Sequence, residues 1–270
     1  MLVSTPAVVL QTYRYSETSK IVRLATRDLG VQSAIAKGVL RPKSPFGAAL
    51  ETLSEGVAQL YHKETRELQT LAAFDVIELR RGLAGDLGRF AGAAALAEVM
   101  LKMAPPAPLP VAYDTLTAAL DALEAASPER VDATAVRAMW RLVAVLGFEP
   151  SLMACVRDGA AIVPAGDAPV LFSVADGGVL CPRCLQASSP HQPPSRLPPQ
   201  AHHDLVALND PRVELPVLDP PHAAAHRRLV ARFVRYHLAE AGSLSALDFW
   251  ERHAWVPPLA IRTPIPSAAS

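Results

Sequence analysis

The chain has 270 residues, enough for one large domain or two of moderate size. Its 26 basic side chains balance 26 acidic ones and half of its residues are hydrophobic, which excludes a disordered chain of high net charge. Residues 1–10 lack the basic start and long apolar run of a secretory signal, and no apolar segment is long enough for a membrane span. We therefore expect a soluble, cytoplasmic protein.

Short strands are predicted throughout the first 80 residues. The segment KIVRLAT at 20–26, the turn DLG at 28–30 and the alternating segment VQSAIA at 31–36 predict a hairpin, in which Gly30 can take a positive φ. Further strands are predicted at 7–13, 55–62 and 68–78. Five short strands at this spacing favour a small barrel or sandwich.

Positive charge is concentrated in residues 14–47, where seven cations stand against two anions. The cations are Arg14, Lys20, Arg23, Arg27, Lys37, Arg41 and Lys43. A neutral chain with this concentration has a surface suited to a polyanion, so we expect these side chains to neutralise nucleic-acid phosphates. A five-stranded barrel with a basic face is typical of the oligonucleotide-binding (OB) fold. The alternative is a loop that the charges only keep soluble, and Tyr13, Tyr15 and Phe46 are candidates either for base stacking or for packing.

Helical periodicity replaces strand periodicity from about residue 81. Helices are predicted near 81–103, 113–124, 132–146 and 222–241, with a proline-rich break at 105–110. Asp132 is expected to start the third of these helices and Gly147 to end it. Trp140 lies on its apolar stripe and is expected in the core.

A cysteine motif, CPRC at 181–184, follows a predicted hairpin turn at 176–177. The earlier segment CVRD at 155–158 completes a C-x-x-D…C-x-x-C pattern. Three cysteines in this arrangement favour a metal over disulfides, and carboxylate oxygen is an acceptable zinc ligand. We expect a structural zinc site with no open position for catalysis. The expected ligands are Cys155, Asp158, Cys181 and Cys184. Two alternatives stay open: His191, His202 or His203 in place of the aspartate, or a site without metal.

Two further patterns raise the question of catalysis. His202, His203 and Asp204 are adjacent, but a dinuclear hydrolytic site needs further carboxylate and histidine clusters, which the sequence lacks. We expect solvated imidazoles in a loop or at a helix start. Glycine-rich phosphate loops are also missing, so we expect a protein that is not an enzyme.

Arginines recur on one face of the last long helix. Arg228, Arg232 and Arg235 are spaced i, i+4 and i+7. Three interpretations remain open: a solvated face, an extension of the DNA-binding surface, or a binding site for an acidic peptide.

Several motifs, taken in order, resemble the bacterial DNA repair protein RecO family. They are ETSKIV at 17–22, TRDLG at 26–30, AKGVLRPKS at 36–44, FG at 46–47 and LGFEP at 146–150 with Cys155 after it. The resemblance covers nearly all of residues 1–255. Leu40 is additional to the usual basic turn, and a lysine that commonly follows the last long helix is missing.

The resemblance implies an α+β multidomain protein. The expected parts are an OB-fold barrel at 1–80, helical segments at 81–150 and 191–255, an inserted zinc-ribbon-like hairpin at 151–190 and a flexible tail at 256–270. The implied function is recombination mediation: binding single- and double-stranded DNA, annealing strands, and loading RecA onto coated single strands together with RecR. The implied partner is the acidic tail of the single-stranded-DNA-binding protein. The alternative is an RNA- or protein-binding module acting in transcription or translation.

Overall fold

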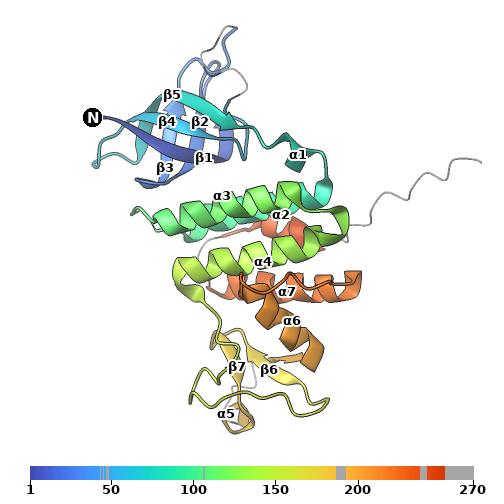
Figure 1. The fold of residues 1–270 in the computed structure, drawn as a ribbon. Helices are drawn as coiled ribbons and strands as arrows, with labels where there is room; N and C mark the ends of the chain where they lie inside the picture. The colour runs from blue at the N-terminus through green and yellow to red at the C-terminus, as the bar shows by residue number, and fades with distance from the viewer. Residues whose placement is uncertain are drawn as a thin grey trace, which may run out of the picture.

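The protein has three layers, a five-stranded barrel, a group of helices beneath it and a small sheet at the far end, as the computed structural model in Figure 1 shows. The structure describes residues 1–42, 44, 46, 49–105, 107–186, 193–237 and 242–252. The barrel strands are β1 (Leu2–Arg14), β2 (Lys20–Thr26), β3 (Gly30–Ala36), β4 (Glu55–Tyr61) and β5 (Leu68–Glu78). The larger helices are α2 (Leu87–Met103), α3 (Pro110–Ala125), α4 (Val131–Val143), α6 (Pro199–Asn209), α7 (Pro220–His237) and α8 (Ser245–Arg252). The short elements are α1 (Arg81–Ala84), η1 (Pro128–Arg130), η2 (Ala144–Phe148), β6 (Val170–Ser173), β7 (Gly178–Leu180), α5 (Pro182–Gln186) and β8 (Ser195–Leu197).

The first five strands form a closed barrel in the order β1-β2-β3-β5-β4. β3 and β5 run parallel, and the other neighbours are antiparallel. The predicted β2–β3 hairpin is confirmed: Thr26 pairs with Gly30, whose φ is 70°. The Thr26 hydroxyl donates a hydrogen bond of 2.7 Å to the Gly30 carbonyl and fixes the turn. The expected OB-like barrel is therefore present.

Because side chains alternate along a strand, each barrel strand can contribute to two hydrophobic cores. Val22 and Leu24 of β2 face the barrel interior, whereas Ala25 packs with the helices. Val8 and Leu10 of β1 also join the helical core. Because the barrel wall shares a core with the helical body, the two parts are packed into one structure.

The chain between β3 and β4 closes one end of the barrel. Phe46 and Leu50 are buried in the barrel core, so Phe46 packs and is not available to stack on bases. The Leu53 amide then donates to the Val9 carbonyl over 2.7 Å and ties this segment to β1. Gly56 is required where β4 meets β5, since a Cβ there would lie 2.4 Å from the Asp75 carbonyl oxygen.

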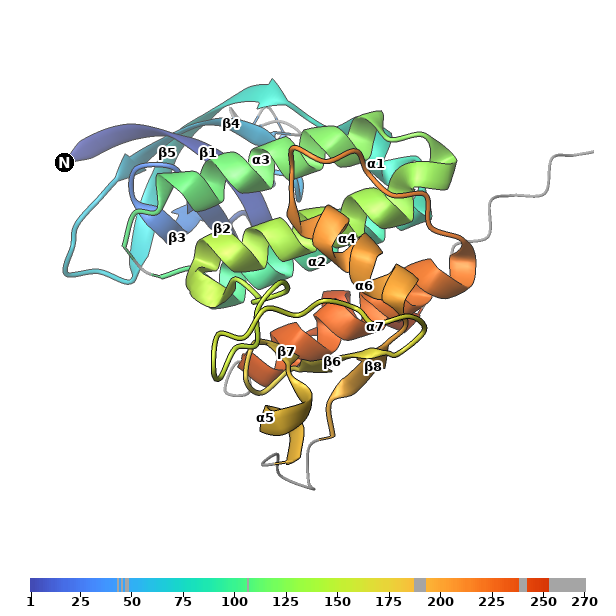
Figure 2. The same ribbon diagram turned by 60° about the horizontal axis from the view of Figure 1, so that its bottom comes forward.

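The helical body is centred on α2 and α4, with α7 and the small sheet packed below (Figure 2). Trp140 of α4 is fully buried, as predicted, and makes edge contacts with Phe172 of β6 and Phe233 of α7. The predicted position of α4 is confirmed to within one residue at its start, but the predicted capping role of Asp132 is wrong. The helix begins at Val131, and the Asp132 carboxylate accepts a hydrogen bond of 2.8 Å from the buried Arg227 guanidinium.

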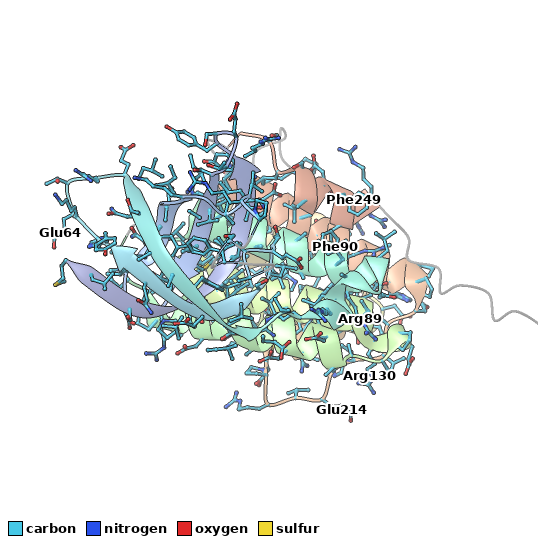
Figure 3. The ribbon with its side chains drawn as sticks, turned by 90° about the horizontal axis from the view of Figure 1, so that it is seen from above. Glu64, Arg89, Phe90, Arg130, Glu214 and Phe249 are labelled. Atoms are coloured by element: carbon cyan, nitrogen blue, oxygen red, sulfur yellow. The ribbon has the colours of Figure 1, made fainter. Side chains whose placement is uncertain are left out.

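Polar contacts fix the ends of the helical body. The Glu98 carboxylate of α2 accepts from the Leu247 amide over 2.9 Å and so caps the start of α8. Arg130 and Glu214 form an ion pair of 3.4 Å between the start of α4 and the loop after α6. Figure 3 shows this pair, and it shows Glu64 in the β4–β5 turn on the opposite side of the molecule from Phe249 of α8.

Arg80 joins the barrel to the helices. Its side chain is 1% exposed and forms ion pairs with Glu55 of β4 and Asp121 of α3. The Tyr113 hydroxyl of α3 donates to the same Glu55 over 3.3 Å, and burial raises the pKa of that tyrosine. Arg80 also has a left-handed backbone, with φ 48° and ψ 45°, which turns the chain from β5 into α1.

We predict that Arg80→Met lowers the free energy of unfolding by roughly 3 kcal/mol, because it leaves the Glu55 carboxylate buried without its cation. Denaturant unfolding measures this change. Arg81→Met is the matched control, since Arg81 is exposed, and its effect should stay within about 0.5 kcal/mol. Equal unfolding midpoints for the two variants would contradict the role of Arg80 in joining the barrel to the helices.

Candidate nucleic-acid interface and metal centre

Four of the seven predicted cations gather at one end of the barrel. Arg14 pairs with Lys20 across β1 and β2, and Lys20 pairs with Ala36 at the end of β3. Lys37 follows directly, and the next turn packs against the β1–β2 turn through a hydrogen bond of 3.0 Å from the Leu40 amide to the Thr18 carbonyl. We call this set the barrel-end group. Its members are Arg14, Lys20, Lys37 and Arg41.

The barrel-end group keeps its positive charge. Within the described residues, none of its members forms an ion pair with a carboxylate. The Arg14 guanidinium donates hydrogen bonds to the carbonyls of Ser16 and Glu17, at 3.3 and 3.4 Å. Unneutralised cations on adjacent strand ends attract a phosphate backbone. Lys43, also predicted for this surface, lies outside the described residues.

The outer face of β1 and β2 carries a different set of side chains, because Tyr13 and Arg23 alternate with Arg14 and Lys20 along the strands. Tyr13 stands opposite Ile21, and Gln11 opposite Arg23, so each pair shares one face. Tyr13 is 45% exposed, as a stacking residue must be. Arg23 is half-buried and lines a cleft of about 450 Å³ between the barrel and the helices α2 and α8.

Arg27 differs from the other predicted cations because it has a carboxylate partner. It forms an ion pair of 2.9 Å with Asp114 of α3. The hydrogen bond raises the pKa of Arg27 and lowers the pKa of Asp114. Arg27 therefore connects the barrel to the helical body, a role that strand periodicity could not reveal because Asp114 is 87 residues away.

The four predicted metal ligands meet in one place. The ligand atoms of Cys155, Asp158, Cys181 and Cys184 all lie within 4.8 Å of one another. Sulfurs bound to one tetrahedral zinc ion would be about 3.8 Å apart, given zinc–sulfur bonds of about 2.3 Å. A small contraction would therefore bring these atoms to bonding distance, and the donor set fits a metal ion.

Backbone turns hold the two halves of this site. Cys155 and Asp158 lie in a turn closed by a hydrogen bond of 2.8 Å from the Gly159 amide to the Cys155 carbonyl. Cys181 precedes α5, and the Cys184 amide donates to its sulfur over 3.4 Å. Gly178 is required beneath the site, since a Cβ there would lie 2.5 Å from the Ser151 carbonyl oxygen.

Arg157 connects the two halves. Its guanidinium makes two hydrogen bonds to Asp176 in the β6–β7 turn, at 2.8 and 3.0 Å, and a third of 3.0 Å to the Cys184 carbonyl. The predicted turn at 176–177 is confirmed, with Gly177 at φ 80°. The site is thus positioned by a side chain that is not itself a ligand.

The electrostatics suit a cation. A hydrogen bond from the Cys155 thiol holds the pKa of Asp158 well below its usual range. Burial raises the pKa of Cys155, but backbone amides outweigh this effect and lower it overall. Burial raises the pKa of the Cys184 thiol to about 12, so a metal ion that binds there would displace the thiol proton.

The histidine alternatives are separate from this cluster. His202 is buried, and its Nε2 lies 2.8 Å from the Leu152 carbonyl oxygen, so the expectation of a solvated imidazole is wrong for it. His203 is exposed on the same helix. Neither belongs to the cluster of possible ligands found among the described residues, and His191 lies outside them.

The three arginines of α7 do not share one environment. Arg228 and Arg232 are exposed, whereas Arg235 is half-buried and forms ion pairs with Asp248 and Glu251 of α8. Arg196 of β8, which the sequence pattern did not indicate, lines the same hollow as the three. No local signal links Arg196 to α7, which begins at Pro220.

The architecture defines a class of protein, an OB-like barrel joined to a helical body that carries a cysteine-rich candidate metal site. The family model for the N-terminal part of recombination protein O matches residues 1–80, and the model for its C-terminal part matches residues 84–245. The chain therefore belongs to the RecO family of DNA repair proteins.

Curated relatives agree with this assignment. The chain is 32% identical over 243 residues to a DNA repair protein RecO from Anaeromyxobacter sp. (strain K), covering 87% of this chain and 91% of that protein. It is 35% identical over 185 residues to one from Symbiobacterium thermophilum, covering 68% of this chain and 71% of that protein. A role in DNA repair follows from the family. Among the helices that the structure describes, none is long and apolar enough to cross a membrane.

We predict about one equivalent of bound divalent metal per purified chain, measured by elemental analysis. Cys181→Ala should remove it, because three remaining ligands cannot close a tetrahedral structural site. Asp158→Cys should retain it, since thiolate replaces a carboxylate oxygen. His203→Ala is the control and should keep the metal. Loss of metal in the histidine variant, with retention in Cys181→Ala, would place the site elsewhere.

Proposed function

We propose that this protein is a non-enzymatic recombination mediator that binds single- and double-stranded DNA and anneals complementary strands. It would also help RecA to load onto single strands coated by their binding protein, acting with RecR at the nucleoid in the cytoplasm. The observation that carries the DNA-binding step is the barrel-end group. These cations lie on adjacent strand ends, without carboxylate partners in the described chain, and the exposed Tyr13 precedes Arg14 in β1.

This arrangement favours backbone recognition over base reading. Cations attract phosphates of any sequence, and an aromatic ring stacks on any base. The described barrel-end group is built from Lys and Arg, which lack hydrogen-bond acceptors and suit phosphate oxygens. We therefore expect affinity that depends strongly on salt and weakly on sequence, as strand annealing requires. An RNA- or protein-binding module is the rival function, and competition between DNA and RNA oligomers separates the two.

We predict that the triple variant Lys20→Gln, Lys37→Gln, Arg41→Gln weakens DNA binding by roughly ten- to a hundredfold for all sequences, because about three phosphate contacts are lost. The slope of log affinity against log salt should fall by about two for single strands. Fluorescence anisotropy at several salt concentrations measures both quantities.

Arg27→Gln is the matched control for this triple variant. It removes a cation from the same strand region, but one that is engaged by Asp114. Its effect on DNA affinity should be less than about threefold. If the folded triple variant binds DNA as tightly as the unmodified protein at low salt, the barrel end is not the DNA-binding surface.

A groove between α3 and α4 offers a site for the acidic tail of the single-stranded-DNA-binding protein. It has a volume of about 460 Å³, and its floor is formed largely by alanines such as Ala118 and Ala138. Arg137 and Arg141 also line the groove, as does Asp114, whose carboxylate is paired with Arg27. Arg137 is held in place by hydrogen bonds to the carbonyls of Ala207 and Val213. Alanines next to two arginines suit a peptide that combines apolar side chains with carboxylates.

We predict that Arg141→Ala weakens capture of the single-stranded-DNA-binding protein by roughly tenfold, because one charge-assisted contact is lost. A pull-down with the intact partner and with a variant lacking its tail measures this change. DNA affinity of Arg141→Ala should stay unchanged. Equal capture of the intact and tail-less partner would exclude the tail as the recognised segment.

Zinc is the metal that we propose for the cysteine site. Three thiolates and a carboxylate in a closed tetrahedral set are typical of structural zinc, and each ligand position is filled by the protein. The bound ion would connect the turn at 155–158 to α5 and so stabilise the small sheet. All of the chemistry at this site would be structural.

A further inference from the structure

A second positive surface lies on the side of the molecule away from the barrel. Arg228 and Arg232 of α7 and Arg196 of β8 are exposed, and they line a hollow of about 390 Å³. None of the three forms an ion pair with a described carboxylate. Glu251, the one acid that lines the hollow, is occupied by Arg235. The hollow therefore carries a net positive charge.

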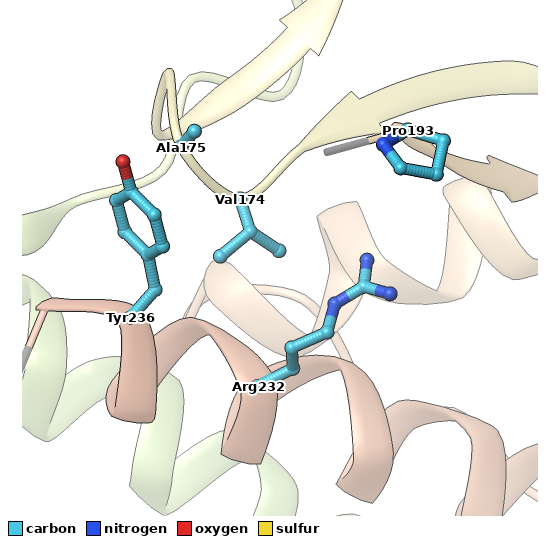
Figure 4. A pocket seen from close by; sticks show the side chains of 5 residues that line it. All are labelled: Val174, Ala175, Pro193, Arg232 and Tyr236. Atoms are coloured by element: carbon cyan, nitrogen blue, oxygen red, sulfur yellow. The ribbon is translucent and has the colours of Figure 1, made fainter. Parts of the chain in front are cut away.

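An apolar hollow adjoins this one and shares Arg232 with it. Figure 4 shows the second hollow, of about 310 Å³, with Tyr236 and Val174 on one side and Pro193 on the other, and the Arg232 guanidinium projecting between them. The Tyr236 side chain is 42% exposed. Arg232 is held by a hydrogen bond to the Ser195 hydroxyl of β8. An exposed ring next to fixed cations is the combination that single-stranded nucleic acid requires.

We infer that this surface, which we call the α7 surface, binds a second DNA strand while the barrel holds the first. It consists of Arg196, Arg228, Arg232 and Tyr236. The arginines would contact phosphates, and one base would enter the apolar hollow beside the tyrosine ring. This inference rests on the proposed function and assigns the second strand to a separate site.

Two features favour a nucleic acid over an acidic peptide here. Three cations without carboxylate partners follow the surface from one hollow into the next, as a phosphate backbone requires, whereas the α3–α4 groove has a mainly apolar floor. The position also matters. In Figure 1 the barrel and the small sheet lie at opposite ends, with α7 beside the sheet, so two strands bound at these sites would not displace each other.

The test uses the full chain and single-stranded oligonucleotides of about eight nucleotides, within the range that one OB barrel holds. The unmodified protein should bind two per chain, and the double variant Arg228→Gln, Arg232→Gln only one, counted by analytical ultracentrifugation. The annealing rate of two complementary strands should fall at least tenfold in this variant. Barrel-site affinity should change less than twofold. The control, Arg81→Gln with Arg212→Gln, removes the same charge from exposed positions and should anneal normally.

Tyr236 gives an independent readout. Tyr236→Phe keeps the ring and should anneal like the unmodified protein, whereas Tyr236→Ala should lose about tenfold in affinity at the second site. Two strands per chain and unchanged annealing in the double arginine variant would overturn the inference while leaving the proposed function intact. The inference would also be overturned if the double arginine variant lost binding to an acidic tail peptide but kept its DNA binding and its annealing rate. Absence of any DNA binding by the unmodified protein would overturn both.

Discussion

The buried cluster around Arg80 is the constraint on which the rest of the structure depends. The Arg80 guanidinium has almost no solvent contact and forms ion pairs with one carboxylate of the barrel and another of α3. Removal of Arg80 would leave the largely buried Glu55 carboxylate without its cation, so these ion pairs hold β4, α3 and the turn into α1 together. Apolar packing of Val8, Leu10 and Ala25 on the helices adds area to the same joint. As a result the barrel and the helical body keep a fixed relation, and so do the surfaces they carry.

A fixed relation gives the distribution of arginines a functional meaning. Arg27, Arg80 and Arg227 each have a carboxylate partner and connect elements far apart in the chain, and of these Arg80 and Arg227 are buried. Other arginines, at the barrel end and on the α7 surface, face solvent and have no such partner in the part of the chain that the structure describes. A chain with zero net charge therefore contains both structural ion pairs and exposed positive surfaces. Under our proposal, these two surfaces would hold two DNA strands.

The candidate metal site lies at the end of the molecule away from the barrel, where a bound ion would stabilise the small sheet. The small sheet has only three short strands and a minor apolar cluster around Cys155 and Leu180, too small to be stable alone. Phe172 anchors its upper side against Trp140 and Phe233, and a metal ion would fix its lower side. The sheet carries Arg196 and the wall of the apolar hollow, so its order determines the shape of the α7 surface. Since β8 is its third strand, the sheet extends past residue 190.

The sequence by itself determined the elements whose signals are local. Strand alternation and the Gly30 turn predicted the β2–β3 hairpin, helical periodicity placed Trp140 in the core, and ligand spacing selected the four residues of the candidate metal site. Only the tertiary structure decided which cations are free. Arg23 lies in the same strand as Lys20, and Arg27 directly follows that strand, but helices distant in the chain cover Arg23 and pair with Arg27. It also revealed that Asp132 serves Arg227 rather than capping α4, and that Arg196 joins α7. Such contacts depend on packing between segments that are distant in the chain, and a local residue pattern cannot predict this packing.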